Sequence, residues 1–261
     1  MKKLFFISFF TTFLLSNNLI NGKVDISIQN PIISKSEITY TKYPINNKTL
    51  LILAPNYRSS GKTLNITLDN QEYSLKVLEG EYKKEQIKLA KPSIIKPNKK
   101  LQERIAKEYD EAVKIYAKST EKVYINKPFI IPLDSVITSP FGSARVFENT
   151  LKSYHSGTDF RAAIGVSIPA SNDGVVVIAK DRYYSGGSVV IDHGYGVYSQ
   201  YYHLSKINVK VGDFVKQSDI IGLSGDTGRV SGPHLHFGIA IKGVSVDPLD
   251  FVNKFNAKAF N

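Results

Sequence analysis

The chain of 261 residues contains no cysteine and no tryptophan, and only one methionine. Without cysteine there is no disulfide, no thiolate metal ligand and no cysteine nucleophile, so any metal must be bound by histidine, aspartate or glutamate. A chain without thiols is also indifferent to the redox state of its compartment. Histidine is scarce as well: there are five, and none lies within the first 154 residues.

Long apolar runs are missing except near the amino terminus. A basic head, Met1–Lys3, precedes an apolar run from Leu4 to Leu15, and polar residues follow. This layout is typical of a secretory signal, because the apolar stretch is short for a bilayer span. We predict a signal peptide over residues 1–22, export to the periplasm and no stable membrane insertion after cleavage. An uncleaved anchor is the alternative.

Composition and charge exclude few functions. Hydrophobic residues make up 42% of the chain and charged residues 22%, which is typical of a soluble globular protein. The formal net charge is +11, but the lysines are spread along the chain instead of forming one block. Such a charge favours anionic surroundings, such as wall polymers, over a defined nucleic-acid site. We therefore expect no nucleic-acid partner. We also expect the protein to be a monomer.

The hydrophobic pattern predicts a mainly β protein whose first half is a small accessory domain. Residues 23–91 contain short alternating runs, such as Val24–Ile28 and Leu64–Leu68, with turn signals between them. Residues 92–126 then change period. A linker with prolines and lysines leads into an amphipathic helix that Asn98 is expected to cap. This helix is expected to connect the accessory domain to the rest of the chain.

The second half is predicted to be a glycine-rich antiparallel β-sheet domain over residues 127–253, followed by a tail over 254–261. Buried strands are expected at Gly174–Ala179, Ser188–Asp192 and Ile220–Leu223. All five histidines lie in this region. Because histidine is the usual metal ligand and the usual acid or base near neutral pH, we expect the chemistry to reside here.

Two local patterns indicate a metal site. His234 and His236 are two residues apart in an alternating run, so both side chains project from one face of a strand. His155 and Asp159 are four residues apart, and an extended backbone returns them to the same side. Zinc accepts imidazole and carboxylate together, and a catalytic site keeps one position for water. His155, Asp159 and one of the His234/His236 pair complete such a set; surface histidines and a capping aspartate are the alternative.

The other two histidines have different surroundings. His203 lies in another alternating run, Tyr198–Leu204, and is expected on a strand. His193 lies next to the glycines of a predicted turn. We interpret His193 as a structural residue or a supporting one, not as a ligand.

The segments His155–Asp159, Tyr202–Leu204 and Gly232–Phe237, taken together, resemble the lysostaphin/LytM family of zinc peptidoglycan endopeptidases. The resemblance covers roughly residues 127 to 253. It implies that zinc is bound by His155, Asp159 and His236 and that His203 and His234 are the catalytic histidines. No member of this set is missing.

The resemblance also implies a substrate, the peptide part of peptidoglycan. We expect D,D-endopeptidase action on D-alanyl–diaminopimelate cross-links, accompanied by D,D-carboxypeptidase action as a further option, through a zinc-activated water. Cleavage of glycine-rich bridges is the other activity of this family. A catalytically silent protein of the same fold, which binds the wall or activates an amidase, is the alternative function. The accessory domain is a candidate gate or positioning element for the site.

Overall fold

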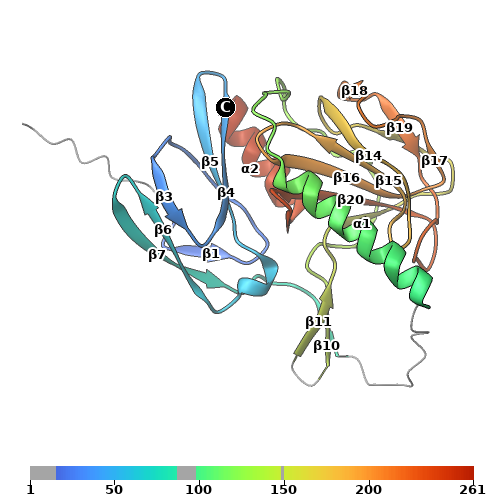
Figure 1. Ribbon diagram of the computed structural model, residues 1–261, viewed down its shortest axis with the longest axis horizontal. Helices are drawn as coiled ribbons and strands as arrows, with labels where there is room; N and C mark the ends of the chain where they lie inside the picture. Colours follow the sequence, from blue (N-terminus) through green and yellow to red (C-terminus); the bar gives the residue numbers. More distant parts are fainter. Residues whose placement is uncertain (1–15, 87–97, 148–149) are drawn as a thin grey trace, which may run out of the picture.

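The computed structural model describes residues 16–86, 98–147 and 150–261 (Figure 1). The apolar run of the predicted signal and most of the predicted linker lie outside these ranges. The expectation of a mainly β protein with a C-terminal antiparallel sheet is confirmed. None of the helices in the described part of the chain combines the length and apolarity that crossing a bilayer requires.

Two small sheets form the N-terminal half, with strand orders β1-β7-β6-β3 and β2-β5-β4. A short 3-10 helix, Tyr57–Ser59, follows β5, and β8 forms a sheet with strands of the C-terminal half. The strands of this half are β1 (Asn18–Ile20), β2 (Asp25–Ile28), β3 (Ile33–Ser36), β4 (Thr39–Ile45), β5 (Lys48–Ala54), β6 (Thr63–Leu68), β7 (Gln71–Leu78) and β8 (Lys84–Gln86).

Strand β1 lies inside the segment predicted as a signal. It pairs in parallel with β7, and Leu19 is buried in the core of this sheet. Asn21 is also buried; its side chain donates a hydrogen bond to the Tyr57 carbonyl and accepts one from the Gly80 backbone N–H. A cut after residue 22 would remove these groups from the fold. We therefore expect any cleavage to precede Asn18.

The middle strand β5 is buried on both faces. Its alternate residues point to opposite sides of the sheet, as in any strand. Leu51 and Leu53 pack between the two N-terminal sheets, whereas Leu50, Ile52 and Ala54 belong to the hydrophobic core of the C-terminal half. The two halves of the chain therefore share one core.

The C-terminal half is built on a large antiparallel sheet with the order β18-β14-β15-β16-β20-β12-β9, to which β21 adds by pairing with β20. Two three-stranded sheets flank it, with orders β13-β19-β17 and β11-β10-β8. The strands are β9 (Ile137–Ser139), β10 (Ala144–Phe147), β11 (Thr150–Tyr154), β12 (Thr158–Arg161), β13 (Ser167–Pro169), β14 (Gly174–Arg182), β15 (Gly186–Asp192), β16 (Val197–Leu204), β17 (Lys206–Ile207), β18 (Phe214–Val215), β19 (Ile220–Leu223), β20 (His234–Ile241) and β21 (Val244–Val246).

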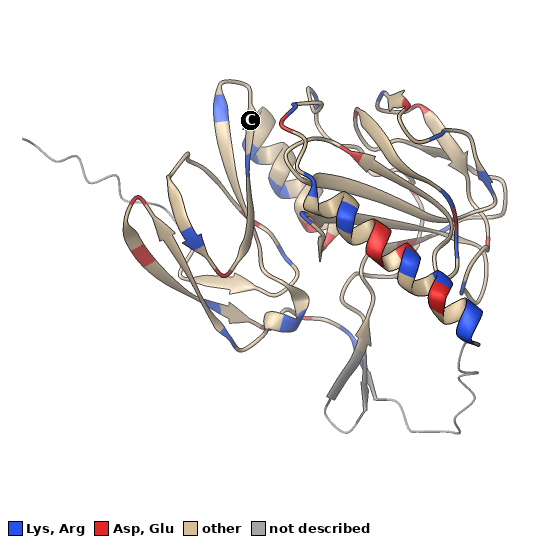
Figure 2. Ribbon diagram, viewed as in Figure 1, with Lys and Arg blue, Asp and Glu red and all other residues tan. Residues whose placement is uncertain are grey.

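Helix α1 (Lys99–Ala117) confirms the amphipathic prediction. The Asn98 side chain accepts a hydrogen bond from the Leu101 N–H, as expected of an N-cap. The helix lies across one face of the large sheet and carries charged residues of both signs along its length (Figures 1 and 2). Its last turn packs on this sheet through Tyr116, whose ring meets Tyr198 edge to face.

The predicted tail over residues 254–261 is wrong. Helix α2 (Pro248–Phe260) continues through nearly all of it. Asp247 caps the helix and Pro248 occupies its first turn, both favourable at a helix start. Phe251, Phe255 and Ala259 recur every four residues and are buried in the shared core, which explains why this segment is ordered as a helix.

Candidate metal site

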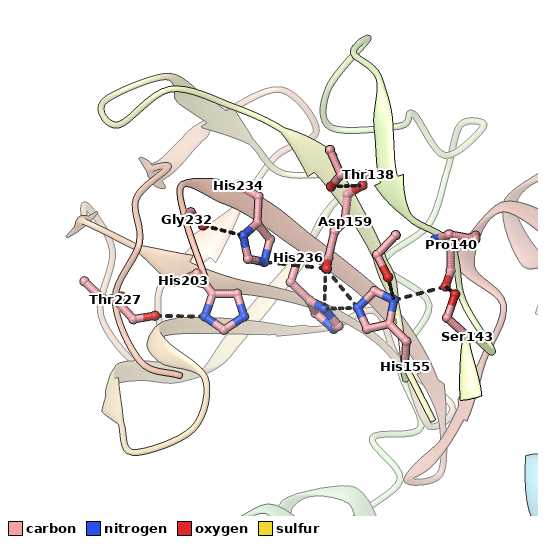
Figure 3. A network of polar contacts seen from close by, with 11 residues as sticks. Thr138, Pro140, Ser143, His155, Asp159, His203, Thr227, Gly232, His234 and His236 are labelled. Atoms are coloured by element: carbon pink, nitrogen blue, oxygen red, sulfur yellow. Dashed lines mark hydrogen bonds and ion pairs between the residues drawn. The ribbon is translucent and has the colours of Figure 1, made fainter. Parts of the chain in front are cut away.

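Three side chains bring their ligand atoms together at one edge of the large sheet (Figure 3). The atoms are His155 Nε2, Asp159 Oδ1 and His236 Nδ1, and each pair of them is 2.9 Å apart. Tetrahedral zinc with bonds of about 2.0–2.1 Å would hold its ligands about 3.3 Å apart. The three atoms therefore lie near the spacing that a bound zinc ion requires.

Strand pairing accounts for two of the three ligands. Asp159 on β12 lies directly opposite His236 on β20 in an antiparallel register. Opposite residues of such a pair share a face, so both side chains project to the same side. His234 shares that face because it lies two residues before His236. The alternation predicted from the sequence for this run is confirmed.

The third ligand, His155, comes from the turn before β12. Both backbone polar groups of His155 are hydrogen-bonded. Its N–H donates to the Ser143 carbonyl, and its carbonyl accepts from the Gly142 N–H. Its ring Nδ1 lies 3.1 Å from the Pro140 carbonyl oxygen, which can only accept a hydrogen bond. Nδ1 therefore carries the proton, and Nε2 has a lone pair directed at the other two ligands.

The ring of His236 depends on a glycine for its space. A methyl group at Gly157 would lie 2.5 Å from His236 Nε2 and 2.6 Å from the Phe237 carbonyl oxygen. The Nε2 atom itself is buried and has no hydrogen-bond partner among the described residues. The ring is therefore positioned by packing, with Nδ1 as its one engaged nitrogen.

Electrostatics favour the metal-binding forms of Asp159 and His236. Burial would raise the pKa of Asp159, but hydrogen bonds and charge from His155 and His236 outweigh it and hold this pKa below its usual range. Burial lowers the pKa of His236, although Asp159 opposes the shift. An ionised carboxylate and neutral imidazoles are the forms that bind a divalent metal.

The two remaining histidines lie beside the ligands. The rings of His203 and His234 are 4.8 Å apart between centroids, and His234 Nε2 is 3.7 Å from Asp159 Oδ2. Each Nδ1 donates to a backbone carbonyl, that of Thr227 for His203 and that of Gly232 for His234. Each Nε2 atom therefore carries the lone pair of its imidazole ring. Burial lowers the pKa of His203 to about 4.

His203 reaches the site through an unusual backbone conformation. Its φ is +66°, in the left-handed region that few residues other than glycine adopt. Here β16 carries an extra residue relative to β15, between the pairs Val189–Tyr201 and Gly187–Leu204. In a regular strand His203 would share the core face with Tyr201. The bulge turns it to the face of His234 instead.

Tyr202 is a site residue that the sequence analysis did not single out. It lies directly opposite His236 across β16 and β20, and its ring stacks on the imidazole with a centroid distance of 5.2 Å and an angle of 8°. Its position next to His203 in a strand was the signal that could have identified it. His193 lies apart from the cluster: it is buried and bonds to the Asp173 carbonyl and the Ser199 hydroxyl.

The fold and the site thus define a class, a mainly β protein that brings two imidazoles and one carboxylate together as a candidate metal site, with two further histidines beside it. Residues 153–248 match the model of Peptidase family M23. The family and the donor set confirm the expected zinc cofactor.

Two characterised proteins with similar sequences agree with this match. The chain is 45% identical over 121 residues to Peptidoglycan DD-endopeptidase ShyA of Vibrio cholerae, covering 45% of this chain and 28% of ShyA. It is 43% identical over 104 residues to lysostaphin of Staphylococcus simulans, covering 38% of this chain and 21% of that protein. The chain therefore spans about a quarter of the length of these relatives.

One solved structure shares the fold over both halves of the chain. It is a putative peptidase M23 from Pseudomonas aeruginosa, with a TM-score of 0.63 and 24% identity. The match covers 93% of this chain and 96% of that one. The fold of the two halves together thus recurs in another protein.

Proposed function

We propose that this protein is an exported zinc peptidase that hydrolyses peptide cross-links of peptidoglycan in the periplasm. The bond we propose is the one between D-alanine and diaminopimelate, with removal of terminal D-alanine as an accompanying activity. The observation that supports it best is the convergence of five side chains, three as ligands and two beside them, in a family M23 domain. The name of ShyA, a peptidoglycan DD-endopeptidase, supports the choice of bond.

In this proposal His155, Asp159 and His236 hold the zinc ion. Bound zinc polarises the scissile carbonyl and lowers the pKa of a water molecule. His203 and His234 present their Nε2 atoms to the same space, since each Nδ1 is engaged with a carbonyl. One imidazole accepts the proton of the attacking water, and the other donates a hydrogen bond where negative charge develops.

The alternative function is a catalytically silent protein that binds the wall or activates an amidase. Such a role requires neither a metal nor two proton-carrying groups beside it. The structure brings together all three ligand atoms and positions both flanking histidines through carbonyl hydrogen bonds. This arrangement favours the enzyme.

Digestion of purified peptidoglycan, with mass analysis of the released fragments, tests the proposal. We expect cross-linked dimers to be converted to monomers, and a chelator to stop this. His203→Ala should keep stoichiometric zinc and lose activity by on the order of 10²–10⁴-fold, as expected for loss of a general acid or base. His236→Ala should lose both zinc and activity. A purified protein without zinc that releases nothing, yet binds the wall, would favour the silent alternative.

A further inference from the structure

Arg161 ends strand β12 next to the metal site. It follows Asp159 by two residues and lies directly opposite His234 on β20. Thr158 and Phe160 of the same strand are buried in the other face, whereas Arg161 is exposed. Alternate residues of a strand share a face, and so do opposite residues of an antiparallel pair. The Arg161 side chain therefore belongs to the face that carries Asp159 and His234.

The backbone of Arg161 is fixed, but its guanidinium has no partner. The N–H donates to the Val136 carbonyl, and the carbonyl accepts from the Ser135 hydroxyl. The guanidinium makes no hydrogen bond or ion pair with any residue that the structure describes. The nearby carboxylate of Asp159 is already engaged by two imidazoles. Arg161 thus presents an uncompensated positive charge beside the site.

The other arginines whose side chains are described all have partners. They bond to acidic residues or backbone, or lie over aromatic rings: Arg104 with Asp181, Arg182 with the Glu108 carbonyl, Arg58 over Tyr154 and Arg229 over Tyr184. Most guanidinium groups of this chain therefore serve its own fold. Among the arginines whose side chains are described, Arg161 alone has no partner and is available for a ligand.

We propose that Arg161 binds a substrate carboxylate, the one on the carbon attached to the scissile amide nitrogen; this inference rests on the proposed function. A guanidinium binds a carboxylate through two parallel hydrogen bonds, which adds orientation to affinity. Opposite residues of an antiparallel pair have Cβ atoms about 4.5–5.5 Å apart. A carboxylate bound by Arg161 therefore places the amide nitrogen, two bonds away, beside His234.

The proposal identifies the substrates by their chemistry. In a D-alanyl–diaminopimelate cross-link, the carbon next to the amide nitrogen carries a free carboxylate. In a terminal D-alanyl-D-alanine, the same position carries the C-terminal carboxylate. In a glycine bridge, the corresponding carbon carries an amide carbonyl of the next peptide bond and no free carboxylate. Arg161 would therefore admit both D,D substrates and disfavour glycine bridges.

Steady-state kinetics of the zinc-loaded full chain on matched substrates test this. The substrates are a stem peptide ending in D-alanyl-D-alanine, the same peptide as its C-terminal amide, and pentaglycine. We expect the free acid to be cleaved roughly 10- to 100-fold faster in kcat/KM than the amide, the range expected for a charged hydrogen-bonded pair. Arg161→Ala should lose this factor on the acid, mainly through KM, and leave the amide unchanged. Arg161→Lys should restore part of the preference.

Lys206→Ala is the matched control, because Lys206 is an exposed cation on β17 and should not alter the ratio of acid to amide. Equal zinc content in all variants shows that the site is intact. Cleavage of acid and amide at equal rates, or an unchanged preference in Arg161→Ala, overturns the role of Arg161 while the peptidase stands. Cleavage of no substrate by the zinc-loaded wild type overturns the proposed function itself.

Discussion

Gly157 shows how a single missing side chain shapes the metal site. Because a methyl group here would overlap His236 Nε2 and a backbone carbonyl, Gly157→Ala should displace the His236 ring. We expect zinc affinity to fall roughly 10- to 100-fold, the range seen when groups that position a ligand are lost. Competition with a chromogenic chelator measures it. Gly232→Ala is the control, since a methyl group there meets nothing within 4 Å. Equal affinities for the two variants would contradict the argument.

The left-handed conformation of His203 predicts an uneven response to substitution. A residue other than glycine in this region costs on the order of 1–3 kcal/mol, and asparagine tolerates it best. His203→Asn should therefore be more stable than His203→Ala by about 1 kcal/mol in denaturant unfolding. The same pair of substitutions at His234, whose φ is not positive, should show no such preference. Equal stabilities of the two His203 variants would indicate that the conformation is not strained.

The two kinds of histidine also show what sequence can and cannot provide. His234 and His236 obey strand alternation, so their shared face follows from a spacing of two. The direction of His203 depends on a bulge that forms only when β16 pairs with β15. Nothing local in the Tyr198–Leu204 run reveals that partner. The resemblance therefore implied the five candidate residues, which lie together in the structure, but it did not imply the bulge that directs His203 toward them.

At the scale of elements, helix α1 is connected to the metal site through two tyrosines. The hydroxyl of Tyr116 accepts a hydrogen bond from Gln200 and also shares a hydrogen bond with the Tyr202 hydroxyl. The Tyr202 ring in turn stacks on His236. Tyr202→Leu should loosen zinc binding roughly 10-fold, because the ring that orients this ligand is lost. Tyr116→Phe should have a smaller effect in the same direction. Chelator competition gives the affinity, and the absorption spectrum of the cobalt-substituted protein reports the geometry.

Tyr109→Phe is the control on the same helix, because this side chain is 68% exposed. It should change neither the affinity nor the cobalt spectrum. An unchanged zinc affinity in Tyr202→Leu would show that the stack is incidental to the site.

The two helices differ in how their prediction fared. The change of period within residues 92–126 and the cap residue Asn98 predicted α1 correctly. Helix α2 carried signals of the same kind, with Asp247 before Pro248 and apolar residues every four positions. Because it lies at the end of the glycine-rich pattern, the sequence predicts a tail over residues 254–261 in its place. The order of strands, which sets the shared core, has no comparable local signal.

At the scale of the whole molecule, the N-terminal half is joined to the site and not only to the sheet. The Tyr57 ring stacks on Tyr154, the residue before His155, at 4.0 Å and 8°. Its hydroxyl donates to the Gly142 carbonyl. Tyr82 packs closely against Gly142, where a methyl group would lie 2.2 Å from its ring. These contacts favour positioning over gating as the role of the N-terminal half.

Removal of residues 24–97 separates the two roles. A gate would leave a folded and more active peptidase, whereas a shared core cannot be divided in this way. Ile26, Tyr43, Leu50 and Ile52 bury apolar side chains of the C-terminal half. Burial of each large apolar side chain stabilises the folded state by about 1.5–3 kcal/mol. Several such losses together equal the stability of a typical domain, about 5–15 kcal/mol. We expect the truncated chain to be insoluble or, if it stays in solution, to give the circular dichroism spectrum of an unfolded chain.

Tyr57→Ala tests the same point without breaking the core. It removes the stack beside His155, so zinc affinity and wall hydrolysis should fall while the circular dichroism spectrum stays unchanged. Tyr57→Phe keeps the ring and should retain most of the zinc affinity and most of the hydrolytic activity, because the ring and not the hydroxyl contacts Tyr154. A gate predicts the opposite sign, since loosening it opens the site. A soluble truncated chain, or Tyr57→Ala protein, that digests peptidoglycan faster than the wild type would restore the gate and refute the positioning role.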